Sequence, residues 1–175
     1  MPAIAKTALS HLSGPIVSVT VGSGAEAKTR ALHKDLLKAK SRYFEGCLSG
    51  KFSESVNNQV TLPDMNPEAF GAFVVWAYTG KIESDDKDCK IDRASKLVRL
   101  WILSDRLMCE SLQNLCMDQL RSLLFGSHPQ TADLVLIVDT LNLDSVLADY
   151  YIKQMAFDMA WGWWDDIVIQ HSWHT

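Results

Sequence analysis

The amino-acid sequence has no excess of basic residues and no long hydrophobic run. Its 17 Lys and Arg residues are fewer than its 21 Asp and Glu residues, the formal net charge is −4, and the basic residues are scattered along the chain. A nucleic-acid-binding domain usually gathers its basic residues into a patch or stripe. A helix that crosses a bilayer needs about 20 consecutive apolar residues, and no run in the sequence approaches that length. We therefore expect no direct nucleic-acid partner and no membrane insertion.

Metal-binding and catalytic patterns are also missing. The four cysteines form no Cys-x-x-Cys pair and have no histidine at zinc-finger spacing; they are Cys47, Cys89, Cys109 and Cys116. The motifs Gly-x-Ser-x-Gly, His-Glu-x-x-His and Gly-x-x-x-x-Gly-Lys do not occur. We expect reduced thiols in an intracellular protein of the cytoplasm or nucleus, with no catalytic residue, metal or cofactor. The sequence thus indicates a protein that is not an enzyme.

The patterns of apolar and capping residues place strands early in the chain and helices late. Ile16–Val21 is rich in β-branched residues and is followed by glycines, which is typical of a strand that enters a turn. Asn66 is a good N-cap and Pro67 suits a first helical position, which predicts a helix over 67–78. Further strands are predicted at 29–33 and 59–62, and further helical segments at 36–48, at 94–101 with Asp92 as cap, at 112–124, at 132–141 and at 147–159. The run at 132–141 also fits a buried strand. The order of the elements predicts an α+β fold.

Six short segments occur in the order that is typical of one family. They are 31–37 (ALHKDLL), 41–44 (SRYF), 50–55 (GKFSES), 60–64 (VTLPD), 67–70 (PEAF) and 76–82 (WAYTGKI). Together they resemble the BTB (POZ) domain family, and with the opening strand IVSVTVG they are most similar to fungal BTB domain-containing proteins. The resemblance implies a small β-sheet wrapped by a cluster of α-helices, with extra C-terminal helices.

The resemblance also implies a division of the chain and a function. We expect a flexible N-terminal tail at 1–14, a BTB/POZ domain at 15–125, and a C-terminal helical extension at 126–175. The implied function is a non-catalytic protein-protein interaction module, used as an adaptor that docks on a cullin-type ubiquitin ligase. The alternative is a self-associating scaffold or regulator that acts by homo-oligomerisation without a ligase. Many dimeric members resemble one another in having an Asp at the start of the first strand. Ile16 stands at that position in this sequence, so a dimer with exchanged strands is not expected.

A candidate docking motif comes from the same resemblance. In members that bind a cullin, an apolar residue, any residue and a glutamate follow the second early helix, and Phe52, Ser53 and Glu54 match this pattern. An aromatic side chain that inserts into a partner, beside a carboxylate that fixes the register, is typical of an interface hot spot. The alternative interpretation is that Phe52 fills the protein's own core while Glu54 is solvated.

Tryptophans gather near the end of the sequence. Four of the six lie within 161–173, at Trp161, Trp163, Trp164 and Trp173. Because aromatic residues dominate interface hot spots, this cluster is a second candidate partner-binding site. The alternative is a terminal helix that packs on the rest of the protein.

Overall fold

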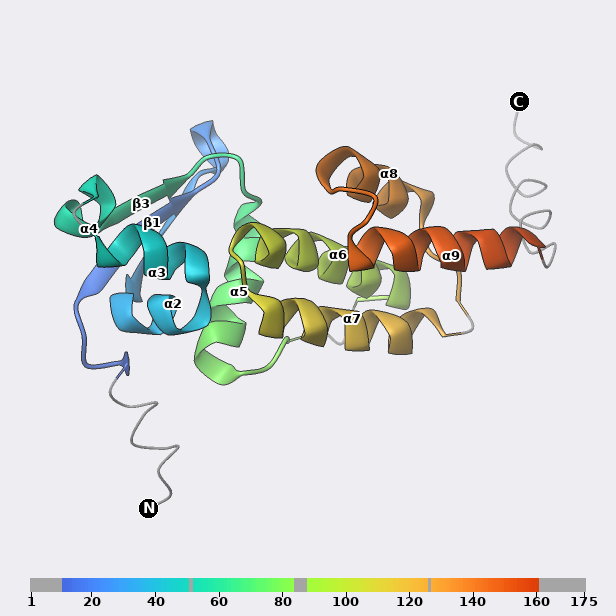
Figure 1. The fold of residues 1–175 in the computed structure, drawn as a ribbon, viewed down its shortest axis with the longest axis horizontal. Coiled ribbons are helices and arrows are strands. Elements are labelled where there is room, and N and C mark those ends of the chain that lie inside the picture. The colour runs from blue at the N-terminus through green and yellow to red at the C-terminus, as the bar shows by residue number, and fades with distance from the viewer. Residues whose placement is uncertain (1–10, 51, 84–87, 126, 161–175) are drawn as a thin grey trace, which may run out of the picture. The chain divides into compact units, whose positions relative to one another are not determined.

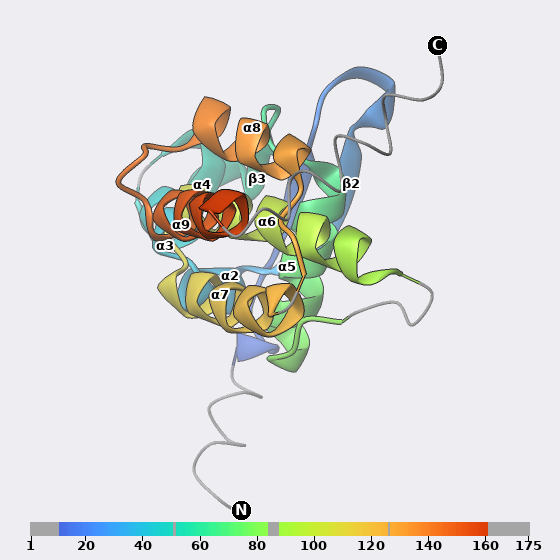
Figure 2. The same cartoon turned by 90° about the vertical axis from the view of Figure 1, so that its right-hand side faces the viewer.

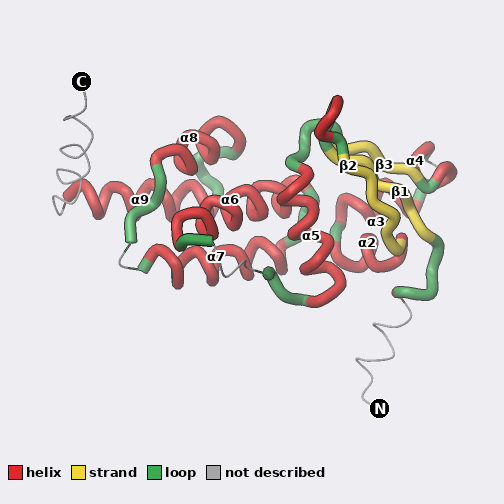
Figure 3. Tube along the Cα trace, turned by 180° about the vertical axis from the view of Figure 1, so that it is seen from behind, coloured by secondary structure: helices red, strands yellow, loops and turns green. Residues whose placement is uncertain are grey.

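The computed structural model describes residues 11–50, 52–83, 88–125 and 127–160. The chain divides into two compact units, the first made of residues 1–85 and 99–115 and the second of residues 86–98 and 116–175. Figure 1 shows the elements in chain order. The described strands form one sheet in the first unit, and the other regular elements are helical (Figure 3). This arrangement confirms the predicted α+β fold. Among the described residues, no helix is long and apolar enough to span a membrane.

The sheet has three strands in the order β2-β1-β3, namely β1 (Ile16–Val21), β2 (Lys28–His33) and β3 (Gln59–Leu62). A short 3-10 helix, η1 (Gly24–Glu26), lies between β1 and β2. β2 is antiparallel to β1, whereas β3 is parallel to it. Alternate side chains of β1 are buried, at Val17, Val19 and Val21, because successive side chains of a strand point to opposite faces. The parallel pairing needs a crossover connection, and the helices of this crossover bring the chain to the start of β3.

Helices α2 (Lys34–Lys40) and α3 (Arg42–Ser49) replace the single helical segment that was predicted over 36–48. The two helices lie side by side (Figure 1). They are separate because Ser41 has an extended backbone and caps α3, accepting a hydrogen bond on its Oγ from the Phe44 N–H at 3.2 Å. The same hydroxyl donates to the Leu107 carbonyl at 2.6 Å. Ser41 therefore ends one helix and starts the next.

Helix α5 (Pro67–Thr79) follows the predicted bounds. Asn66 Oδ1 accepts hydrogen bonds from the N–H groups of Glu68 and Ala69, both at 2.9 Å. Gly80 ends the helix with a φ of 74°, a left-handed conformation that glycine adopts without strain. The capping residues therefore act as predicted.

An aromatic cluster joins α3 and α5 in the core of the first unit. The ring centroid of Phe73 lies 6.3 Å from that of Phe44, 5.5 Å from that of Phe70 and 6.0 Å from that of Trp76. All four side chains are buried. Rings at these separations interact favourably beyond their apolar burial, by about 0.5–1.5 kcal/mol per pair. The cluster thus holds the crossover helices to α5.

The remaining helices are α6 (Lys90–Arg106), α7 (Glu110–Leu124), α8 (Thr131–Thr140) and α9 (Val146–Ala160). Both α6 and α7 contribute residues to each unit. Asp92 lies in the first turn of α6 and is not its cap; its N–H donates to Cys89 Sγ at 3.4 Å. The apolar run at 132–141 forms a helix, α8, which packs on α9 (Figure 2).

Two buried carboxylates of the second unit have polar partners. Ser95 Oγ donates to Asp133 Oδ2 at 2.8 Å. Asp158 Oδ2 lies 3.2 Å from His128 Nδ1, and Gln154 Nε2 donates to Asp158 Oδ1 at 3.3 Å. Because a buried charge is costly unless it is paired and hydrogen-bonded, these contacts stabilise the packing of α8 and α9.

The cap of α5 gives a test of the fold. We expect Asn66→Ala to lower the free energy of unfolding by about 1 kcal/mol, because two N–H groups lose their acceptor. Urea denaturation followed by circular dichroism measures the change. Asn114→Ala, an exposed substitution inside α7, is the matched control and should cost nothing, since alanine favours helix. Equal stability of Asn66→Ala and the wild type would contradict the role given to the cap.

Candidate protein-docking site

The predicted docking motif lies at the start of a short helix, α4 (Ser53–Asn57), in the first unit. Phe52 is the N-cap residue, and 62% of it is exposed to solvent. Ser53 is exposed and Glu54 is half-buried. The alternative interpretation, in which Phe52 fills the core, is therefore wrong. The motif follows α3, and the short helix α4 places Glu54 in its first turn.

Gly50 makes room for the Phe52 ring. A Cβ added to Gly50 would lie 2.9 Å from Phe52 Cδ2 and 3.1 Å from Phe52 Cε2. The first distance is shorter than real Cβ contacts and the second is tight, so a side chain at residue 50 would require the ring to shift. The Phe52 ring thus lies close to the backbone at the end of α3.

Local hydrogen bonds keep the Glu54 carboxyl charged. The backbone N–H of Glu54 and then the Ser53 hydroxyl, which donates to Glu54 Oε2 at 2.9 Å, hold the pKa of Glu54 below its ordinary value. The site therefore presents a charged carboxylate two residues after an exposed phenyl ring.

Lys34 fixes α4 to the rest of the first unit. Lys34 Nζ donates to Asn58 Oδ1 at 2.9 Å, to the Ser55 carbonyl at 3.2 Å and to Ser55 Oγ at 3.4 Å. Ser55 Oγ in turn donates to the Leu48 carbonyl, in the last turn of α3, at 2.9 Å. We call Lys34, Ser55, Asn58 and the Leu48 carbonyl the Lys34 cluster. It ties the start of α2 and the end of α3 to the middle and the C-terminal end of α4.

Partly exposed residues extend the site onto α3. Tyr43 and Cys47, one helical turn apart, are half-buried. Burial raises the pKa of the Tyr43 hydroxyl and of the Cys47 thiol, and the nearby Glu54 carboxylate raises both further. Val56, one turn after Phe52, is also exposed. We call Phe52, Glu54, Val56, Tyr43 and Cys47 together the α4 surface.

Sequence reasoning found Phe52 and Glu54 but missed the residues that position them. Asn58 has a φ of 50°, a left-handed conformation that ends α4. Asparagine tolerates this conformation, so the Asn57-Asn58 pair before a strand was a signal that could have predicted the helix end. Nothing in the sequence pattern pairs Lys34 with Ser55 and Asn58, which lie 21 and 24 positions further along the chain.

The second candidate site, at Trp161, Trp163, Trp164 and Trp173, lies outside the described residues. Among the described residues, no group of three or more His, Cys, Asp or Glu side chains could hold a metal ion.

Comparison with known proteins identifies the family. The family model of the BTB/POZ domain matches residues 13–124 of this chain. The chain belongs to the BTB/POZ domain family. BTB/POZ domains are protein-protein interaction modules, and the family is non-enzymatic. The predicted interaction function is confirmed at this level.

Individual relatives of this BTB/POZ chain are distant. It is 28% identical over 99 residues to the human "Kelch repeat and BTB domain-containing protein 7", a match that covers 56% of this chain but only 13% of that protein. The solved "BTB domain of zebrafish PATZ1" aligns with a TM-score of 0.47 and 19% identity, covering 68% of this chain and 92% of that one. The narrower similarity to fungal members stays a prediction.

The Lys34 cluster gives a direct test of how the site is built. We expect Lys34→Met, which keeps most of the unbranched side chain and removes its ammonium, to lower the free energy of unfolding by about 1–3 kcal/mol, because oxygens of Ser55 and Asn58 lose a charged donor. The amide protons of Ser55 and Val56 should then exchange faster with solvent.

Lys38→Met, one turn further along α2, is the matched control. In this variant the amide protons of Ser55 and Val56 should exchange at a rate close to that of the wild type. Hydrogen-exchange mass spectrometry measures both variants. If α4 exchanged at the wild-type rate in Lys34→Met, Lys34 would not be what holds it.

Proposed function

We propose that this BTB/POZ chain is an adaptor that docks on a cullin-type ubiquitin-ligase scaffold through the α4 surface. The observation that carries the proposal is that the Phe52 ring is exposed and the Glu54 carboxyl has a lowered pKa, at the three residues that match the docking motif. The human relative, whose name joins kelch repeats to a BTB domain, supports an adaptor role.

The energetics of the α4 surface favour a protein partner. Burying a phenylalanine side chain fully is worth about 1.5–3 kcal/mol, and Phe52, which is 62% exposed, can still gain the larger part of it. The Glu54 carboxylate, two residues further along the chain, steers and orients an incoming basic or hydrogen-bonding group. Because the Lys34 cluster already orders α4, binding does not have to order the helix, and less of the interaction energy is lost.

An adaptor also needs a second surface that holds a client. In the human relative, the name indicates kelch repeats outside the BTB domain, and this chain spans only 13% of that protein. Within the present sequence, a client would be held by residues of the predicted extension, 126–175. Self-association without a ligase, the alternative function, stays a prediction.

Calorimetric titration of the full chain with the amino-terminal region of a cullin tests the proposal. We expect Phe52→Ala to weaken binding by roughly 30-fold, which corresponds to a hot-spot loss of about 2 kcal/mol. Glu54→Gln, which keeps the shape of the side chain, should weaken binding less and mainly slow association.

Phe125→Ala is the matched control, because Phe125 is 89% exposed and lies in the second unit, at the end of α7. Its affinity should equal that of the wild type. Docking through the α4 surface would be refuted by equal affinities of Phe52→Ala and Phe125→Ala, or by a wild type that binds no cullin.

A further inference from the structure

Strand β2 lies at an edge of the sheet in the first unit. The strand order is β2-β1-β3, so β1 pairs with one side of β2 and no described strand pairs with the other. All six residues of β2 pair with β1 in an unbroken register. An edge strand of this kind presents a row of N–H and C=O groups to which another chain can add a strand. We call the outer side of β2 the β2 edge.

The hydrogen bonds to β1 determine which backbone groups of β2 face outward. Lys34, directly after the strand, donates its N–H to the Pro15 carbonyl at 2.9 Å and continues the register of the pair. Residues of an antiparallel pair alternate between bonding across to the neighbouring strand and pointing away from it. The residues that point their N–H and C=O groups away from β1 are therefore Thr29, Ala31 and His33.

Tyr78 of α5 closes one end of this row. The His33 N–H donates to Tyr78 Oη at 3.3 Å, and the same oxygen lies 2.8 Å from His33 Nδ1. Thr29 and Ala31 are exposed, and no group in the described part of the chain accepts a hydrogen bond from their N–H groups. The β2 edge thus offers two unpaired positions, two residues apart, beside a closed one.

The long side chains of β2 favour an acidic partner. Lys28 and Arg30 are exposed and lie two residues apart, on one face of the strand. Neither forms an ion pair with an acid in the described ranges, including Glu26 just before β2 and Glu68 of α5. The Arg30 guanidinium lies close to α5, since a Cβ added to Gly71 would be 3.2 Å from Arg30 Nη2. Two cations without acidic partners therefore flank the β2 edge.

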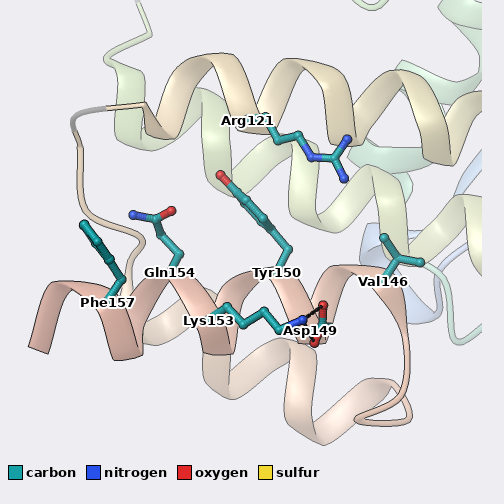
Figure 4. Close-up of a pocket in the computed structure, with 7 residues that line it drawn as sticks. All are labelled: Arg121, Val146, Asp149, Tyr150, Lys153, Gln154 and Phe157. Carbon is teal, nitrogen blue, oxygen red and sulfur yellow. Dashed lines mark hydrogen bonds and ion pairs between the residues drawn. The ribbon is translucent and has the colours of Figure 1, made fainter. Parts of the chain in front are cut away.

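The pocket beside α9 in the second unit differs in this respect (Figure 4). Of the two cations that line it, Lys153 pairs with Asp149 at 2.8 Å, and Arg121 lies 3.9 Å from Asp118. Both cations of that pocket already have an acidic neighbour, whereas those of β2 are free to meet a ligand.

A second copy of the chain does not suit the β2 edge. Two paired β2 strands would crowd Lys28 and Arg30 of both copies, and like charges on neighbouring strands are destabilising. Basic residues on an edge strand are a common device against such self-pairing. A strand that carries carboxylates has the opposite effect, because the Cβ atoms of directly opposite residues lie only about 4.5–5.5 Å apart. The charges of β2 thus select an acidic partner.

We propose that the β2 edge binds an extended acidic segment of a partner protein as an added strand of the sheet. The backbone of the segment pairs with the N–H and C=O groups of Thr29 and Ala31. Acidic residues two positions apart face Lys28 and Arg30, and the small side chains of Thr29 and Ala31 leave room on the other face. The proposal does not rest on cullin docking, because β2 shares no residue with the α4 surface.

Amide exchange of the full chain, followed by nuclear magnetic resonance, tests whether the edge is free and where it binds. We expect the N–H groups of Thr29 and Ala31 to exchange fast and those of Arg30 and Leu32 slowly. The N-acetylated peptide Thr-Glu-Thr-Glu-Thr-Glu-Thr, whose glutamates share one face when it is extended, should slow exchange at Thr29 and Ala31. Protection of these two amides without peptide would overturn the proposal, since the edge would already be occupied.

Fluorescence anisotropy of the same peptide, labelled with a dye, tests the charge requirement. We expect Arg30→Glu to weaken binding roughly tenfold, because an attractive cross-strand pair becomes a repulsive one. Arg99→Glu, which makes the same change of charge at an exposed arginine of α6, is the matched control and should bind like the wild type. Equal losses in the two variants would mean that only the net charge matters, and would refute the pairing with β2.

A peptide of the same sequence with every backbone nitrogen methylated separates strand addition from simple charge attraction. It keeps the glutamates but has no N–H to donate to the carbonyls of the β2 edge, so we expect it not to bind. Binding equal to that of the unmodified peptide would overturn the proposal. A wild-type chain that bound neither peptide would do the same, because the basic residues would then only block the edge.

Discussion

The Lys34 ammonium is the interaction on which the candidate docking site depends. It donates to Ser55 and Asn58, and Ser55 donates onward to the last turn of α3. The Asn58 carbonyl accepts the Ser18 N–H at 2.9 Å, so the residue that ends α4 also begins the pairing of β3 with β1. An ammonium has three protons to donate, and here they join two crossover helices to the start of a strand. Without them, a helix of five residues would have little reason to be ordered.

This constraint bears on the docking role proposed for the exposed Phe52. A single exposed phenylalanine is common on protein surfaces and needs no functional explanation. Phe52 differs because its ring lies close to Gly50 and because a carboxylate with a lowered pKa lies two residues away. Groups on an ordered element lose less freedom on binding, which favours a hot spot. The membership of the chain in the BTB/POZ family gives this geometry its functional meaning.

Local signals predicted the parts of the fold that depend on neighbouring residues. The β-branched run of β1 and the Asn66-Pro67 start of α5 carry their information within a few positions, so both elements agree with the structure. The break at Ser41 was missed because its hydroxyl bonds to Leu107, 66 residues away. Helix α4 was missed for the same reason, since contacts with Lys34 stabilise it and its own sequence is too short to show periodicity. The exposure of Phe52 needed the structure, while the division into 15–125 and 126–175 stays a prediction.

The central claim is that the α4 surface is the docking site for a cullin. Amide hydrogen exchange of the full chain, free and bound to the amino-terminal region of a cullin, tests it most directly. We expect slower exchange in the bound state at 43–47 and 52–58, with no change along the β2 edge of the sheet, Lys28–His33. Slower exchange along β2 with none at 52–58 would contradict the account.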